Sequence, residues 1–230
     1  EVLGLEFEDI RILQGDSDVA MMGTGTFGSR SSGVGGASIQ VAAEKIVKKC
    51  KPLVAHHLEA AAEDIEFSDG IFRVIGTDKT MGFREAAKHA HNFMTAPPDF
   101  ELGLDEWGAW SPPAPTFPNG CHVVEVEIDP ETGTTEIIRY CMVDDVGTII
   151  NPLLLAGQVH GGAAQGIGQI LCEKMVWDEE NGQIISGSFM DYTMPRADDC
   201  PSFEMTENEV PTPTNPMGIK GAGEAGCVGA

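Results

Sequence analysis

The stretch HVVEVEIDPETGTTEIIRYCMV, residues 122–143, decides the fold. In its first seven residues apolar side chains alternate with Glu125 and Glu127, which is the period of a β-strand with one apolar face. Residues 129–133, DPETG, have the composition of a turn, and residues 135–143 form a second run of strand-forming residues. The stretch therefore predicts an antiparallel hairpin.

Two further turn signals lie outward from this hairpin on either side. Asp69-Gly70 separates residues 64–67 from residues 71–74, and both central positions of such a turn favour residues that tolerate positive φ. Asn181-Gly182 marks another hairpin. Three hairpins favour the α+β class, with antiparallel-rich sheets and packed helices in two lobes, over a parallel sheet.

The sequence also predicts three helices outside these turns. Apolar residues recur at spacings of three and four from about Ala37, and Pro52 is expected to end or kink that helix. A short helix is predicted over 83–91. Asn151 followed by proline predicts the start of another helix, which runs to about Cys172.

A proline-rich connector is predicted to divide the chain into two lobes. Residues 1–94 form the first lobe, and 120–230 form the second. The connector, 95–119, holds six of the fourteen prolines. We also expect a strand edge within 3–13 and an irregular tail after Asp191.

Composition narrows the class of function. The 230 residues include 14 Lys and Arg against 36 Asp and Glu, a formal charge of −22, which argues against a nucleic-acid partner. No apolar run reaches the ~18 residues of a membrane span, and the first ten residues do not resemble a signal peptide. The six widely spaced cysteines predict reduced thiols and a cytoplasmic protein.

Three glycine-rich segments are candidates for a site. GTGTFGSRSSGVGG, residues 23–36, leads into a helix, and bare backbone amides at a helix start suit an anion. The spacing matches neither a dinucleotide fingerprint nor a P-loop. The segment is therefore either a phosphate-binding loop or a surface loop.

The second segment is the helix after Asn151, which contains AGQVHGGAAQGIGQ, residues 156–169. Its five glycines cost the helix about 4–5 kcal/mol of local propensity relative to alanine, so something must need the small side chains. Close packing of a neighbouring element is one explanation. A ligand lying against the bare backbone is the other.

The third segment is GIKGAGEAG, residues 218–226. Its glutamate, Glu224, stands among glycines, where a bound ligand could cover it and exclude water. Desolvation raises the pKa of a carboxylate, as a general base near neutral pH requires. The alternative is an exposed side chain on a flexible segment. Lys220 is expected to point away from the carboxylate or to reach a ligand oxygen.

Taken together, GTGTFGSRSS, the hairpin that ends in DDVGTIINP, AGQVHGGAAQGIGQ and GIKGAGEAG resemble one family along essentially the whole chain. The family that these motifs resemble is the molybdenum-binding large subunit of the xanthine dehydrogenase/aldehyde oxidase family. The motifs are most similar to those of bacterial carbon-monoxide-dehydrogenase-type large chains. Members are several times longer. The resemblance implies that this chain is a C-terminal portion of such a subunit, containing part of the molybdopterin-binding domain.

The resemblance also implies the site. Such enzymes hold a molybdenum-molybdopterin cofactor, in bacteria often the cytosine dinucleotide form, and the dithiolene binds the metal, so no metal ligand is expected here. Glu224 would be the catalytic base that takes a proton from a Mo–OH group. The residues implied to contact the cofactor are Gly28, Ser29, Arg30, Ser31, Gln158, His160, Gly161, Lys220, Gly221 and Gly223.

By the same resemblance, electrons would leave through flavin (FAD) and 2Fe-2S partner subunits, and the assembled complex would dimerise. The substrate would be a small molecule with an electron-poor carbon: carbon monoxide, an aldehyde or an N-heterocycle. The substrate-defining loop is expected upstream of Glu1. From the residues alone, a non-catalytic phosphate- or nucleotide-binding module and an acidic subunit-docking domain remain alternatives.

Overall fold

The computed structural model describes residues 2–18, 23 and 25–229. Thr24, in the first glycine-rich segment, therefore lies outside the described residues.

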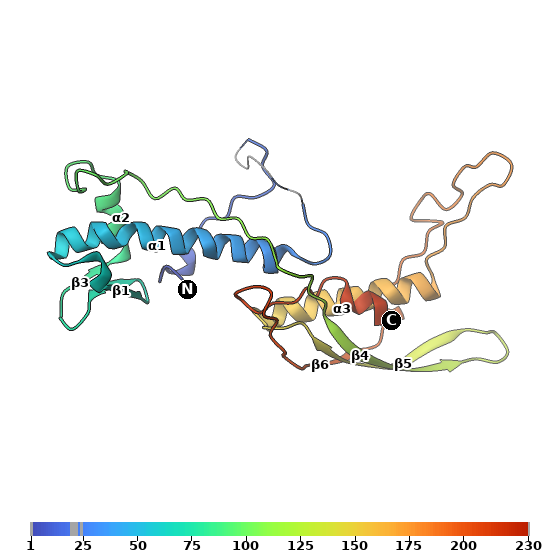
Figure 1. The fold of residues 1–230 in the computed structure, drawn as a ribbon. Coiled ribbons are helices and arrows are strands. Elements are labelled where there is room, and N and C mark those ends of the chain that lie inside the picture. Colours follow the sequence, from blue (N-terminus) through green and yellow to red (C-terminus); the bar gives the residue numbers. More distant parts are fainter. Residues whose placement is uncertain (1, 19–22, 24, 230) are drawn as a thin grey trace. The chain divides into compact units, whose positions relative to one another are not determined.

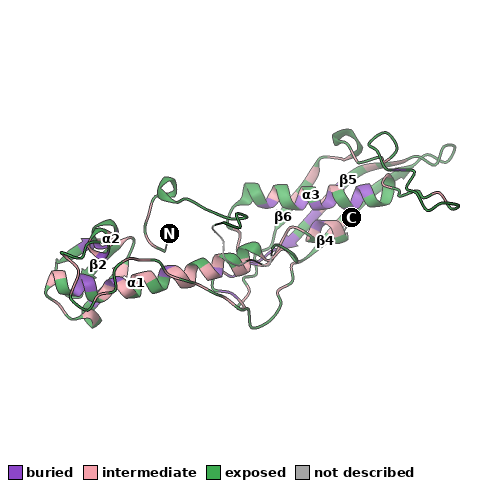
Figure 2. Cartoon of the chain, turned by 90° about the horizontal axis from the view of Figure 1, so that it is seen from above, coloured by how far each residue is buried: buried purple, intermediate pink, exposed green. Residues whose placement is uncertain are grey.

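The chain consists of two compact units. The first comprises residues 1–25 and 35–111, and the second comprises residues 26–34 and 112–230. Each unit has its own three-stranded sheet and its own cluster of buried residues, and the ribbon of buried residues is purple in Figure 2. The lobe boundaries expected from the sequence stay a prediction.

The first unit combines two helices with an antiparallel sheet of order β1-β2-β3 (Figure 1). Its elements are η1 (Phe7–Asp9), α1 (Ala37–Leu58), η3 (Ala62–Asp64), β1 (Ile65–Ser68), β2 (Ile71–Val74), β3 (Thr80–Gly82) and α2 (Phe83–Ala90). The hairpin predicted at Asp69-Gly70 is confirmed, with φ of 50° and 76° at the two turn residues. These positive values match the right-handed twist of the paired strands.

The core of the first unit lies between α1 and the sheet. Leu53 and Val54 of α1 are fully buried together with Phe72 of β2. Pro52 was expected to end or kink the helix, and it does not end it, because α1 continues to Leu58. A proline inside a helix costs ~3 kcal/mol, and burial of the two following side chains offsets that cost.

The strand edge expected within residues 3–13 is wrong. Phe7–Asp9 form a single 3₁₀ turn instead. Ile10 and Ile12 are 51% and 74% exposed. An alternating pattern yields a strand only where a partner strand supplies the hydrogen bonds, and within the described residues none pairs with this segment.

The second unit contains one long hairpin, one long helix and several short elements. They are β4 (Asn119–Ile128), β5 (Thr135–Asp145), α3 (Pro152–Leu171), η4 (Ala197–Asp199), β6 (Phe203–Glu207) and α4 (Ala225–Gly229). The sheet has the order β4-β5-β6. The hairpin predicted over residues 122–143 is confirmed, and it extends three residues before His122 and two after Val143.

The tail after Asp191 was expected to be irregular, and this is wrong at β6. β6 pairs with β5 in parallel, with Tyr140 opposite Phe203. The strand is only five residues long, and it gains its ladder from a partner about sixty residues earlier in the chain. The Asn181-Gly182 turn is confirmed, since Gly182 has φ of 70° and an antiparallel bridge joins Trp177 to Ile184.

The core of the second unit lies between α3 and the sheet. Tyr140 and Met142 of β5 are 1% exposed, and α3 adds side chains at every fourth position. These helix residues are Leu155, Val159, Ala163 and Ile167. Their spacing places them on one face of the helix, which covers the sheet.

The helix start is confirmed in detail. The Asn151 side chain accepts a hydrogen bond from the backbone N–H of Leu154 at 3.1 Å, and Pro152 is the first helical residue. This N-cap satisfies one of the N–H groups that a helix start leaves unpaired. It sets where α3 begins and therefore where Gln158 lies.

Two properties concern the chain as a whole. All six cysteines lie within the described residues and are free. Across the described part of the chain, we find no helix with the length and apolar character needed to cross a lipid bilayer.

Candidate active site

A cavity of about 570 Å³ lies within the second unit. Three segments that are far apart in the sequence form its walls: residues 26–32, residues 146–158 and residues 219–224. These are parts of the three glycine-rich segments and of the turn that follows β5. The fold therefore brings together segments that the sequence marked separately.

The first wall has a strained backbone. Gly28 and Ser29 have φ of 58° and 52°, and the left-handed region is uncommon for a residue other than glycine. The Thr26 and Ser31 hydroxyls lie 2.6 Å apart and form a hydrogen bond. Ser31–Gly36 then form a single π-helical segment (η2) that leads into α1. Short π segments often occur at functional sites.

Arg30 lies in this loop but is not among the residues that line the cavity. Its guanidinium carbon lies 3.8 Å from the centre of the Phe27 ring, a stacking contact between a cation and an aromatic face. The Arg30 carbonyl accepts a hydrogen bond from the Val34 N–H at 2.9 Å. In this structure Arg30 therefore shapes the loop.

The second wall combines the turn after β5 with the first half of α3. Gln158 lines the cavity and faces the third wall, because a Cβ at Gly223 would lie 3.0 Å from its Oε1 and 3.2 Å from the Ser29 Oγ. These three residues come from the three walls. A larger residue at 223 would close the space between them.

His160 and Gly161 do not line this cavity. The His160 ring packs against Phe203 of β6, with ring centres 5.1 Å apart. Its buried Nε2 has no hydrogen-bond partner among the described residues. Gly161 is exposed, and a Cβ there would meet nothing within 4 Å. The fold thus separates these two residues from Gln158, their near neighbour in sequence.

The third wall is part of the loop from Gly218 to Glu224, and backbone hydrogen bonds hold this loop against the end of β5. The Lys220 N–H donates to the Val146 carbonyl at 2.7 Å, and Ile219 forms a bridge with Gly147. Asn215 adds two hydrogen bonds to Ile219, one to its carbonyl at 2.8 Å and one from its N–H at 3.1 Å.

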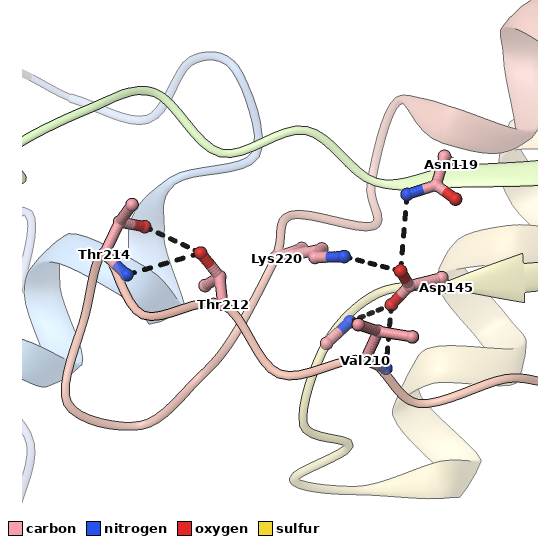
Figure 3. Close-up of polar contacts among 7 residues, drawn as sticks. Asn119, Asp145, Val210, Thr212, Thr214 and Lys220 are labelled. Atoms are coloured by element: carbon pink, nitrogen blue, oxygen red, sulfur yellow. Dashed lines mark hydrogen bonds and ion pairs between the residues drawn. The ribbon is translucent and has the colours of Figure 1, made fainter.

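Asp145 is buried beside this loop and forms an ion pair with the Lys220 ammonium (Figure 3). Burial by itself would raise the pKa of Asp145. The hydrogen bonds from Lys220, Gly147 and Val210, with the positive charge of Lys220, outweigh burial and lower that pKa below its usual value. The ammonium of Lys220 therefore has a fixed partner within the protein.

Glu224 lies at the end of the third wall, exposed, just before α4. α4 packs directly on α3. A Cβ at Gly162 would lie 3.2 Å from the Gly226 Cα, and a Cβ at Gly226 would lie 2.6 Å from the Val159 carbonyl oxygen. Of the two explanations for the helix glycines, close packing therefore applies at Gly162, and the contact holds α4, which begins at the residue after Glu224.

Glu224 also borders a second cavity of about 350 Å³, which the sequence analysis missed. This cavity is lined on another side by His122 and Asp144. His122 is almost completely buried; its Nδ1 lies 2.9 Å from the Tyr140 hydroxyl, and its Nε2 lies 3.3 Å from both carboxylate oxygens of Asp144. Burial and the nearby Asp144 raise the pKa of Tyr140.

The signal for this cluster was a cross-strand pairing. His122 faces Met142 in the register, between Tyr140 and Asp144 on β5, so the three polar residues share one face. A prediction of the exact strand register of this hairpin would have placed these three residues together.

The seven implied site residues that do line the 570 Å³ cavity are Ser29, Ser31, Gln158, Lys220, Gly221, Gly223 and Glu224.

The chain is similar in sequence to subunits of known enzymes. The chain is 38% identical over 228 residues to the carbon monoxide dehydrogenase large chain of Afipia carboxidovorans, covering 99% of this chain and 28% of that protein. It is 37% identical to the nicotine 6-hydroxylase large subunit of Paenarthrobacter nicotinovorans, covering 100% of this chain and 28% of that subunit. The chain thus spans little more than a quarter of the relatives it matches.

Solved structures give the same result. The Cu,Mo-CO dehydrogenase crystal structure matches with a TM-score of 0.91 and 38% identity, over 99% of this chain and 28% of that one. Quinoline 2-oxidoreductase from Pseudomonas putida 86 matches with a TM-score of 0.80 and 39% identity, over 90% of this chain and 26% of that one. These matches confirm the predicted α+β fold.

The family of molybdopterin cofactor-binding domains matches residues 1–201, which is most of the chain and includes the first two walls of the cavity. The fold agrees with structures of molybdenum enzymes over nearly its full length. The chain belongs to the molybdopterin cofactor-binding domain family.

Proposed function

We propose that this chain is the part of a molybdenum hydroxylase large subunit that holds the molybdopterin cofactor and supplies the general base, Glu224. The observation that carries the proposal is the 570 Å³ cavity, because it combines hydroxyl, amide and carboxylate groups from three distant segments in one space. Membership of the molybdopterin cofactor-binding family supports the choice of ligand.

The residues of the cavity fit such a cofactor chemically. A pterin ring carries both donors and acceptors and its phosphate accepts, and the hydroxyls of Ser29 and Ser31 and the amide of Gln158 can donate as well as accept. Gly223 forms a wall of bare backbone where any Cβ would approach Gln158 Oε1 to 3.0 Å. The missing side chain therefore lets the polar groups of Gln158 and Ser29 lie beside the bare backbone of the third wall.

When bound, the molybdenum cofactor supplies the oxygen-transfer and electron-accepting chemistry of the reaction. Gln158, Ser29 and Ser31 bind and orient the ligand through their hydrogen-bonding groups. Leu154 and Leu155 give the second wall an apolar section, which limits the water in the cavity. The Glu224 carboxylate accepts the proton that leaves the oxygen nucleophile as that oxygen attacks the substrate carbon.

The finer parts of the proposal come from the relatives. We propose the cytosine dinucleotide form of the cofactor, FAD and 2Fe-2S clusters on partner subunits, dimerisation of the complex, and a cytoplasmic location where the six thiols stay reduced. Relatives are named as a large chain, a large subunit and a complex subunit gamma, which supports association with other chains. Their names also support a small substrate with an electron-poor carbon.

Glu224→Gln tests the base. The substitution keeps the shape of the side chain and removes its ability to accept a proton, so we expect turnover of the assembled enzyme to fall about 10²–10⁴-fold with molybdenum content unchanged. The measurements are steady-state kinetics and metal analysis on the same preparations.

Glu131→Gln is the matched control for this test. Glu131 is exposed in the turn between β4 and β5 and lines neither cavity, so turnover should be unchanged. Normal turnover of Glu224→Gln at full metal content would contradict the assignment of the base. Joint loss of metal and activity would make Glu224 a structural residue of the site.

A further inference from the structure

Asp145, the last residue of β5, receives hydrogen bonds from four donors (Figure 3). They are the Asn119 Nδ2 at 3.3 Å, the Gly147 N–H at 2.9 Å, the Val210 N–H at 3.1 Å and the Lys220 Nζ. The carboxylate thus joins the start of β4, the turn after β5, the segment after β6 and the third wall of the cavity. Its side chain is 8% exposed.

The ion pair with Lys220 is the charged part of this junction. The Lys220 side chain is 12% exposed, so both charges are largely removed from water. Two unit charges in contact at such a site are weakly screened by solvent. Removing one partner would leave the other charge buried and uncompensated.

The backbone around Lys220 leaves the loop little freedom. Gly147 has φ of 70°, and a Cβ there would lie 2.2 Å from the Gly218 carbonyl oxygen. The Thr148 N–H donates to the same carbonyl at 3.0 Å. The side-chain pair and this backbone contact therefore hold the loop at two points, immediately before it turns toward Glu224.

Lys220 and Glu224 line the same cavity, four residues apart. An ammonium group free to turn toward a carboxylate stabilises its ionised form and weakens it as a base. Paired with Asp145, the ammonium contributes little net positive charge to the cavity.

We propose that Asp145 is a positioning residue for the base: it holds Lys220 at the end of β5, orders the Gly221–Glu224 segment, and keeps the Lys220 charge paired. The inference rests on the proposed role of Glu224 as base.

The test is Asp145→Asn in the assembled enzyme, alone and combined with Lys220→Met. Asparagine keeps the shape and one acceptor oxygen but removes the countercharge of Lys220. In the single variant we expect the acid limb of the kcat/KM profile to move down by about one pH unit, a tenfold change in proton affinity. We expect kcat to fall about tenfold, with a smaller change in KM.

The double variant separates charge from packing. Lys220→Met removes the ammonium that Asp145→Asn leaves unpaired, so the acid limb should return to its wild-type position. A merely structural role for Asp145 would not produce this return. Asp129→Asn is the matched control, because Asp129 lies in the turn at the opposite end of the β4–β5 hairpin and should leave the profile unchanged.

A second measurement is independent of catalysis. Hydrogen exchange of the Gly221–Glu224 amides should be at least about tenfold faster in Asp145→Asn than in the wild type. The same increase is expected in Lys220→Met, which provides the test if Asp145→Asn does not fold. Unchanged exchange in the folded variants, or an unshifted acid limb, would overturn the proposal. If Glu224→Gln were fully active, the base assignment would fail, whereas the exchange result would still decide whether Asp145 orders the loop.

Discussion

Single residues in this chain show how partners decide the state of a titratable group. Asp145 is buried with four hydrogen-bond donors, one of which, Lys220, is also its ion-pair partner, and its pKa is lowered. His57, at the end of α1, is the opposite case. Its buried Nε2 has no partner among the described residues, and its ring lies 3.9 Å from the ring of His89, centre to centre. Burial, and then the nearby His89, lower the pKa of His57.

His57 should therefore make the first unit sensitive to acid. A histidine with a folded pKa below the unfolded value of ~6.5 binds its proton more readily in the unfolded chain. Its neutral form supports the fold above that value, and the support is lost as pH falls through it. The other charged neighbours are His56, which also lowers the pKa, and Glu85, which raises it.

The measurement is the melting temperature of the protein at pH 7.5 and pH 5.5. His57→Gln, which cannot take up a proton, should lose less stability between the two values than the wild type. An equal loss in both proteins would show that other groups cause the acid sensitivity. His91→Gln is the control, since His91 is exposed.

At the scale of elements, local signals predicted the structure well and long-range pairing was missed. The Asp69-Gly70 turn and the Asn151 N-cap each depend on residues within four positions, and both are confirmed. β6 depends on β5, about sixty residues away, and its five residues carry no turn or cap that would mark it. The strand expected within 3–13 had the alternating pattern, but no strand among the described residues pairs with it.

The α3–α4 contact gives a paired prediction. Gly226→Ala should destabilise the protein by about 1–3 kcal/mol, because the new Cβ would lie 2.6 Å from the Val159 carbonyl oxygen and 2.9 Å from the Ala163 nitrogen. Gly161→Ala meets open space and should stabilise the cofactor-free protein by about 0.5–1 kcal/mol through helix propensity. Urea unfolding measures both. Equal effects of the two substitutions would contradict the packing argument.

At the scale of the whole molecule, the candidate site is formed by three segments that lie far apart in the sequence. Only the fold brings them together. The resemblance supplied candidate residues on all three walls of the cavity. It did not supply the separation of His160 from Gln158 or the pairing of Asp145 with Lys220, because both depend on how the helix and loop are docked. The His122 cluster depends on strand register, which composition alone does not fix.

The net charge of −22 is a property of the whole chain and should make its stability depend on salt. Excess like charge repels itself in the compact state, and salt screens that repulsion over ~10 Å at 0.1 M. Raising NaCl from about 10 mM to 150 mM should therefore raise the melting temperature by about 2–4 °C, the shift that ~1 kcal/mol produces at this size. KCl should act alike, and a fall in melting temperature would contradict the argument.

The contact between Gly221 and Ser29 has a consequence for biosynthesis. A Cβ at Gly221 would lie 2.5 Å from the Ser29 Cβ, so the first and third walls meet although almost the whole chain separates them. A ribosome delivers the chain from its N-terminus, and contacts between distant segments form late. The cavity therefore closes only after residue 221 has left the exit tunnel, and all three walls can hold a cofactor only from that stage of synthesis onward.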